Sequence, residues 1–397
     1  MARYVLISAM TFCLFTCTGP AVRNSGARGK EAEIMNIIPE GVDARITINE
    51  NNQFEVSGRQ IWFNGVNTPW NKWNDFGGAG WAAYDDAWWN NEFARLRRAG
   101  INSVRVWLSC NNGNGAIIID DNGMISGASE KHWADLDLFF AAAERNQLYI
   151  MATLLSFDHF KNAPSQGVSR AAEADRWRAM MYSDAAAASF AQNYTIPFVK
   201  RYGGNPWLWS IDLCNEPDWI YEQEQCGKIP WERISYFFAV QSAAIHENSK
   251  TLVTVGISMP KYVSNSLREG NKLSDAFFQK LYPNENAYVD FWSTPHYYDW
   301  KGPIWGVPFY MSPAQYKLDT SKPALMGECG AKGSKGETKG TENNTIITDY
   351  EQAYLNGWHG VMSWTSNGVD GNGNLDDLKS GTLYMLEKYR KLIYPWE

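Results

Sequence analysis

The chain has 397 residues, of which 45% are hydrophobic and 20% are charged, so it can bury one large core or two medium ones. The net charge of −7 argues against a surface of clustered lysines and arginines, and we expect no nucleic acid as a partner. Tryptophan occurs 19 times, often beside glycine, asparagine or aspartate, which places many copies in predicted loops.

The N-terminal residues indicate a targeting signal. Residues 1–17 contain Arg3 and then an apolar stretch, which suits a signal peptide and is too short to span a bilayer. The sequence before Cys17 leaves open whether this cysteine carries a lipid anchor or the chain is simply secreted. We therefore expect a secreted protein or a cell-surface lipoprotein. A flexible linker should follow at residues 18–40, and a single folded domain at residues 41–397.

Apolar runs and helical stretches alternate along the rest of the chain. A short β-hairpin is expected within residues 45–63. Strands are then predicted at residues 61–66, 101–108, 148–155, 208–213, 251–255, 289–294, 324–327 and 360–364. Helices are predicted at residues 86–99, 129–145, from 183 with a break at Pro197, 231–248, 275–281, 313–318, 346–356 and within 376–392. This alternation predicts an α/β fold, a (β/α)8 TIM barrel with a short N-terminal β-hairpin.

Cysteine and histidine patterns indicate neither a disulfide framework nor a metal site. Four of the six cysteines lie beyond the signal segment, and they are either buried thiols or include one bridge such as Cys214–Cys226. The five histidines lack ligand spacing, and no glycine loop suited to phosphate appears. We expect no cofactor, no metal, no nucleotide, and a monomer.

Polar side chains follow several predicted strands, where the active site of such a barrel lies. Asn215-Glu216-Pro217 closes the fourth strand and Glu328 closes the seventh, so the two carboxyls should face each other across the barrel mouth. Cleavage of a glycosidic bond needs such a pair, because one carboxyl protonates the leaving oxygen and the other attacks the anomeric carbon. Arg105 and Tyr298 should keep Glu328 ionised. The charge of Glu328 should in turn raise the pKa of Glu216.

The ordered set of strand-end residues resembles glycoside hydrolase family 5, in clan A. This resemblance implies a retaining enzyme that acts on a β-linked polysaccharide. By position, it implies Glu216 as acid/base, Glu328 as nucleophile, Asn215 as the contact to the sugar 2-hydroxyl, Trp364 as the platform under the sugar, and His296 with Tyr298 as the family's His-x-Tyr element. Many relatives carry a histidine pair after the third strand. Here only His159 stands nearby, as either a substrate contact or a packing residue.

The loop after the first predicted strand indicates which branch of this family the chain resembles. The segment Trp70 to Gly77, followed by Asn102 to Trp107, is similar to the branch of family 5 that contains endo-β-1,4-mannanases. Tryptophans of the rim loops would line the groove or pack beneath the loops; these are Trp70 and Trp73 on the glycone side, with Trp219, Trp300 and Trp305 elsewhere.

The substrate remains open at this point. The sequence leaves β-1,4-mannan or glucomannan as one reading, and cellulose or another β-glucan as the alternative. A non-catalytic polysaccharide-binding protein is a further alternative. Such a protein would be expected to lack Arg105 or one of the two carboxylates, and all three residues are present.

Overall fold

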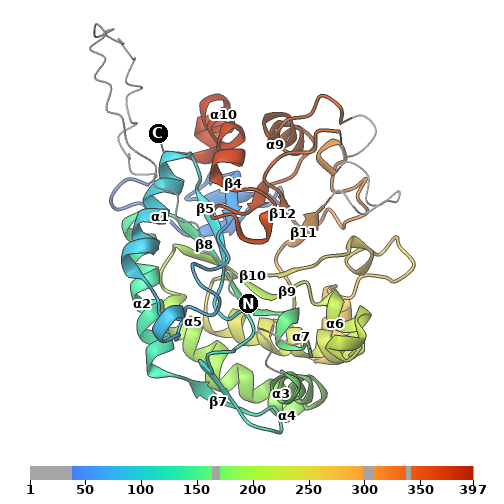
Figure 1. The fold of residues 1–397 in the computed structure, drawn as a ribbon. Helices are drawn as coiled ribbons and strands as arrows, with labels where there is room; N and C mark the ends of the chain where they lie inside the picture. The colour runs from blue at the N-terminus through green and yellow to red at the C-terminus, as the bar shows by residue number, and fades with distance from the viewer. Residues whose placement is uncertain (1–37, 163–169, 298–307, 337–340, 397) are drawn as a thin grey trace, which may run out of the picture. The chain divides into compact units, whose positions relative to one another are not determined.

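The computed structural model describes residues 38–162, 170–297, 308–336 and 341–396 (Figure 1). The predicted signal segment, Cys17 and most of the predicted linker lie outside these residues. The same holds for Tyr298, Trp300 and Trp305, so the groove positions expected for them are not described.

Eight parallel strands close into a barrel in the order β10-β11-β12-β13-β4-β5-β8-β9, as the sequence predicts. Their bounds are β4 (Phe63–Asn67), β5 (Ser103–Trp107), β8 (Tyr149–Ser156), β9 (Leu208–Asn215), β10 (Leu252–Gly256), β11 (Trp292–His296), β12 (Ala324–Gly330) and β13 (Gly360–Trp364). Nearly all their residues are buried, because the strands contact the barrel interior on one face and the helices on the other.

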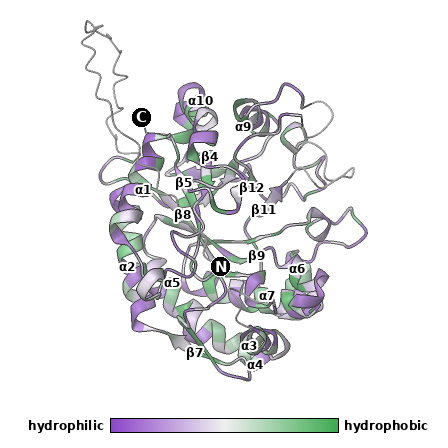
Figure 2. Ribbon diagram, viewed as in Figure 1, coloured by the Kyte–Doolittle hydropathy of each residue, from purple (hydrophilic) through white to green (hydrophobic). Residues whose placement is uncertain are grey.

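Helices surround the strands, and in Figure 2 hydrophobic and hydrophilic residues are mixed along them. They are α1 (Asp86–Arg98), α2 (Glu130–Arg145), α3 (Ala171–Tyr182), α4 (Asp184–Phe190), α5 (Ile196–Tyr202), α6 (Asp218–Glu222), α7 (Trp231–Asn248), α8 (Asp275–Leu281), α9 (Ile346–Leu355) and α10 (Leu375–Ile393). Capping side chains fix where several of these helices begin. Before α2, for example, Ser129 accepts a hydrogen bond from the His132 amide. Within the described part of the chain, no helix has the length and apolar character needed to cross a membrane.

The N-terminal strands close the bottom of the barrel. β1 (Ile46–Ile48), β2 (Phe54–Val56) and β3 (Arg59–Gln60) form an antiparallel sheet, one strand larger than the predicted hairpin. The ring of Phe54 makes edge contacts at 5.1–5.4 Å with Phe63, Trp209 and Phe291. These three residues lie within one residue of the starts of barrel strands, so the opposite end remains for the site.

Three local elements differ from the sequence predictions. Helix α3 was not expected, because Arg170 gives it no side-chain cap. The helix predicted at residues 313–318 is only a turn, which a φ of 67° at Lys317 ends. A hairpin of β6 (Ile117–Ile119) and β7 (Ile125–Ala128) also lies where no strands were predicted. Near Pro197, a π-helical turn at Ala191–Thr195 interrupts the helical segment as expected.

The cysteines of the described region are thiols. Cys110, Cys214, Cys226 and Cys329 are buried and unbridged, so the alternative of a Cys214–Cys226 disulfide is wrong. Burial raises the pKa of the Cys226 and Cys329 thiols to about 12. Both therefore stay protonated and act as small apolar side chains.

Candidate active site

A pocket of about 320 Å³ opens at the C-terminal ends of the barrel strands. Predicted residues that line it are Trp70, Trp73, Asn215, Glu216, Glu328 and Trp364; the lining residues not predicted for the site are Trp107, Phe157, Asp158, Tyr297, Asp370 and Asn372. The two glutamates come from opposite parts of the barrel, since β9 and β12 are not neighbours in the sheet. The pocket thus joins the two carboxyls with four tryptophan rings.

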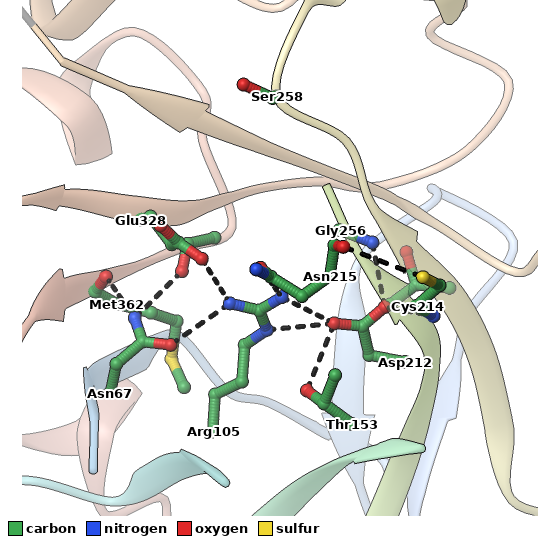
Figure 3. A network of polar contacts seen from close by, with 12 residues as sticks. Asn67, Arg105, Thr153, Asp212, Cys214, Asn215, Gly256, Ser258, Glu328 and Met362 are labelled. Carbon is green, nitrogen blue, oxygen red and sulfur yellow. Dashed lines mark hydrogen bonds and ion pairs between the residues drawn. The ribbon is translucent and has the colours of Figure 1, made fainter. Parts of the chain in front are cut away.

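Arg105 lies at the centre of a buried polar network beneath this pocket (Figure 3). Its Nη1 donates to Glu328 Oε1 at 2.5 Å, while its Nε and Nη2 donate to Asp212 Oδ2 at 2.9 and 2.6 Å. Nη2 also donates to Asn215 Oδ1 at 2.9 Å. With only 1% of its surface exposed, this guanidinium is fixed by ionic hydrogen bonds on both sides.

Neighbouring groups hold the network in place. Asp212 accepts from the Gly256 amide at 2.8 Å and from the Thr153 hydroxyl at 3.1 Å. A Cβ atom at Gly256 would lie only 2.4 Å from Arg105 Nη2, so no larger residue fits there. Asn67 accepts from Arg105 Nη1 at 3.2 Å, and its amide nitrogen donates to the Gly327 and Met362 carbonyls.

Asp212 and Gly256 were missed from the sequence. The signal for Asp212 was present, because it is the one charged residue in strand β9. A buried charge needs a partner, and Arg105 is the one cation in strand β5. Gly256 carried no such signal, because a close approach by a distant side chain leaves no trace in local sequence.

The second partner of Glu328 is Tyr297. Its hydroxyl donates to Glu328 Oε2 at 2.8 Å. Tyr298, for which this contact was predicted, lies outside the described residues, so that contact stays a prediction. Tyr297 was not predicted as a partner of Glu328.

Glu216 follows β9 with a φ of 49°, in the left-handed region, and its amide donates to the Gly256 carbonyl at 2.6 Å. Burial raises its pKa well above the usual range, and the charges of Glu328 and Asp218 raise it further. Asp218 is itself buried, and this burial raises its pKa to about 7.

The two glutamates have unequal surroundings. Burial also raises the pKa of Glu328, but the charge of Arg105 and the hydrogen bonds from Tyr297 and Arg105 oppose this effect. Glu216 has no such ion pair with a guanidinium, and it faces the charge of Glu328. Glu216 is therefore the carboxyl that retains a proton, and Glu328 is the one held as a carboxylate.

Tryptophan rings form the apolar side of the pocket. The Trp364 ring lies 5.1 Å from that of Trp107 and 6.3 Å from that of Trp70, which meets Trp73 at 4.6 Å. The Arg105 guanidinium lies 4.4 Å above the Trp107 ring. The rings thus brace one another, and a flat ligand face can stack on those that line the pocket.

Three other predicted site residues lie away from the pocket. His159 is buried, bonded to Ser109 Oγ at 3.0 Å and packed against Trp177, so it is a packing residue and not a substrate contact. Burial lowers its pKa to about 3. His296 is also buried, beside Phe309, and is not among the lining residues. Trp219, on α6, packs against the main core.

The chain is similar to known proteins in sequence and in structure. The chain is 24% identical over 368 residues to a mannan endo-1,4-beta-mannosidase from Mytilus edulis, a match that covers 86% of this chain and 94% of that protein. No family model matches the chain.

Solved structures share the fold. An endo-1,4-beta-mannanase from Eisenia fetida superposes with a TM-score of 0.70 at 21% identity, covering 86% of this chain and 95% of that one. A glycoside hydrolase family 5 mannosidase from Rhizomucor miehei gives a TM-score of 0.57 at 17% identity, covering 88% and 99%.

Proposed function

We propose that this chain cleaves internal β-1,4 bonds of mannan or glucomannan with retention of configuration. The premise is that it is a glycoside hydrolase related to the mannan endo-1,4-beta-mannosidases. In this proposal Glu216 is the acid/base and Glu328 the nucleophile. The observation that carries it is the unequal setting of these two carboxyls in one pocket.

The first step uses both carboxyls at once. Glu328 Oε attacks the anomeric carbon while Glu216 gives its proton to the leaving oxygen, so a glycosyl ester forms and the bond to the leaving sugar breaks. Arg105 and Tyr297 hold one oxygen each of the Glu328 carboxylate, which fixes its orientation toward the sugar. The second step reverses these roles, as Glu216 takes a proton from the water that cleaves the ester.

Asn215 and Trp364 would position the sugar at the cleaved bond. Asn215 Oδ1 is occupied by Arg105 Nη2, which orients the amide nitrogen for donation to a hydroxyl in the pocket. A hydrogen bond to the sugar 2-hydroxyl strengthens as charge develops in the transition state. The Trp364 indole offers a flat surface for the apolar face of the ring.

A substrate panel tests the proposed specificity. Purified protein should release reducing sugar from galactomannan and glucomannan faster than from carboxymethyl cellulose, mixed-linkage glucan or laminarin. Glu328→Gln, which keeps the size of the side chain, is the matched control for contaminating activity and should release almost nothing. Activity confined to the glucans would replace the mannanase assignment by a glucanase on the same site. A folded protein inactive on every substrate would support a binding protein instead.

Tyr297→Phe should shift the acidic limb of the pH–rate profile to higher pH. The limb reports ionisation of Glu328, and the Tyr297 hydroxyl lowers the pKa of that carboxyl. Without the hydroxyl this pKa rises, more Glu328 is protonated at a given acidic pH, and activity falls there first. We expect about a tenfold loss of kcat at the optimum, the size of one charge-assisted hydrogen bond.

The matched control for this variant is Tyr262→Phe. It removes a tyrosine hydroxyl bonded to Glu222 at 2.5 Å, and neither residue lines the pocket. Its profile should coincide with that of the wild type. A Tyr297→Phe profile that loses height without moving its acidic limb would contradict the role given to Tyr297.

A further inference from the structure

A second and larger cavity, of about 940 Å³, adjoins the catalytic pocket. The two share Trp73 as a common wall. The larger cavity is formed by the loops that follow β4 and β5, by β6, and by the start of α3. The two cavities are therefore neighbours, with the Trp73 side chain between them.

An exposed tryptophan lies in this cavity. Trp81, on the 3-10 turn Gly80–Ala82, exposes 70% of its surface and is the most exposed large hydrophobic residue in the described chain. Ile118 on the opposite hairpin lines the same space and is 49% exposed. A large apolar surface left in water inside a hollow is a common mark of a ligand site.

Both arginines that line the cavity are paired with carboxylates. Arg170 pairs with Glu173 at 3.1 Å and donates to the Asn111 carbonyl, and Arg176 pairs with Asp121 at 2.7 Å. Each arginine is thus matched by a carboxylate, so the cavity presents donors and acceptors without an excess of positive charge. This combination suits a neutral ligand rich in hydroxyl groups better than an anion.

The place of the cavity favours the non-reducing arm of a polysaccharide. The proton donor Glu216 lies on the side of the leaving, reducing-end arm, since it protonates the leaving oxygen. The cavity shares no lining residue with the end of β9 that carries Glu216, and it extends from Trp73.

We propose that this cavity binds the non-reducing arm of the β-1,4-linked substrate, beyond the sugars held in the catalytic pocket, with Trp81 as a stacking platform. The inference rests on the proposed function and adds to it a set of distal sugar sites. It implies that the enzyme cleaves long chains more efficiently than short ones, because the energy of the distal contacts is available only to long substrates.

Hydrolysis of manno-oligosaccharides of three to six units tests this proposal. The reaction is run in ¹⁸O-water, and mass spectrometry of the products gives the cleavage positions. We expect Trp81→Ala to keep the wild-type kcat/KM on the shortest oligosaccharide that is cleaved and to lose about three- to tenfold on mannohexaose, as for one aromatic contact. The kcat/KM of Trp81→Phe on mannohexaose should lie between those of the wild type and of Trp81→Ala. The cleavage positions of Trp81→Ala should move toward the non-reducing end. Complexes with many sugars on the non-reducing side of the cleaved bond would no longer gain binding energy from the Trp81 ring.

Tyr182→Ala is the matched control, since Tyr182 is 54% exposed at the end of α3 and does not line the cavity. An equal loss at all lengths, no loss at any length, or a shift of cleavage toward the reducing end would overturn the inference and leave the proposed function standing. A wild-type protein that cleaves none of these oligosaccharides would instead refute the proposed function, and the inference with it.

Discussion

Glu328→Ala should lower turnover on the order of 10⁴–10⁶-fold, as expected when a catalytic nucleophile is removed. Glu216→Ala should lose about 10²–10⁴-fold on polysaccharide, the usual contribution of general acid catalysis. Both side chains are at the pocket surface, so neither truncation should unfold the barrel. Initial rates on galactomannan, with circular dichroism to verify folding, measure the two losses.

Azide separates the two roles on an aryl mannoside with a good leaving group. In Glu328→Ala the azide anion can take the place of the carboxylate and attack from the same face of the sugar, which gives an α-mannosyl azide. In Glu216→Ala the ester still forms, and azide then attacks it from the other face to give a β-mannosyl azide. Proton NMR distinguishes the two anomers, and the wild type in water should give the β product first.

Glu222→Ala is the control for these variants, because its carboxylate bonds Lys261 and Tyr262 and does not line the pocket. It should retain wild-type turnover and show no response to azide. The assignment of roles is wrong if the two azide anomers appear in the opposite variants, or if either catalytic variant keeps near-normal activity.

Arg105→Met should damage both activity and stability. The cation that Asp212 and Glu328 share would be lost, and an unpaired buried carboxylate costs about 3–5 kcal/mol of folding free energy. The pKa of Glu328 would rise, because Arg105 lowers it. The acidic limb of the pH–rate profile should then move to higher pH, further than in Tyr297→Phe. Denaturant unfolding and pH–rate profiles measure the two effects.

Arg201→Ala is the matched control for the loss of an arginine ion pair. Arg201 pairs with Asp137, and both side chains are nearly half exposed. Such a surface pair contributes about 0–1 kcal/mol, and its removal should leave the pH profile unchanged. A stability loss for Arg105→Met no larger than for Arg201→Ala would contradict the account of the buried network.

The fold could be predicted from the sequence because its signals are local. Each barrel strand is a short apolar run that a turn ends, as in β13, whose predicted and observed bounds coincide. Barrel geometry then brings strand ends together, so Glu216 and Glu328 could be placed on one rim without knowledge of any distance. The signal for the start of α2 is also local, because the helix begins at the Ser129 cap.

The remaining features depend on contacts between distant segments. Gly256 lies close against Arg105, and His159 turns inward, where it contacts Ser109 and Trp177. The residues next to Gly256 and His159 in the sequence indicate neither contact. The cavity beside Trp81 likewise requires two loops, strand β6 and the start of α3, and the alternation of strands and helices does not predict how these meet.

The electrostatic contact between the two glutamates has a consequence for the timing of proton transfer. The charge of Glu328 helps to raise the pKa of Glu216. In the proposed mechanism that charge is gone once Glu328 is esterified, so the pKa of Glu216 should fall and the group should become ready to accept a proton from water. Hydrolysis of the ester restores the charge and with it the affinity of Glu216 for the proton. Each half of the reaction thus resets the protonation state that the next half needs, with no net exchange of protons with the solvent.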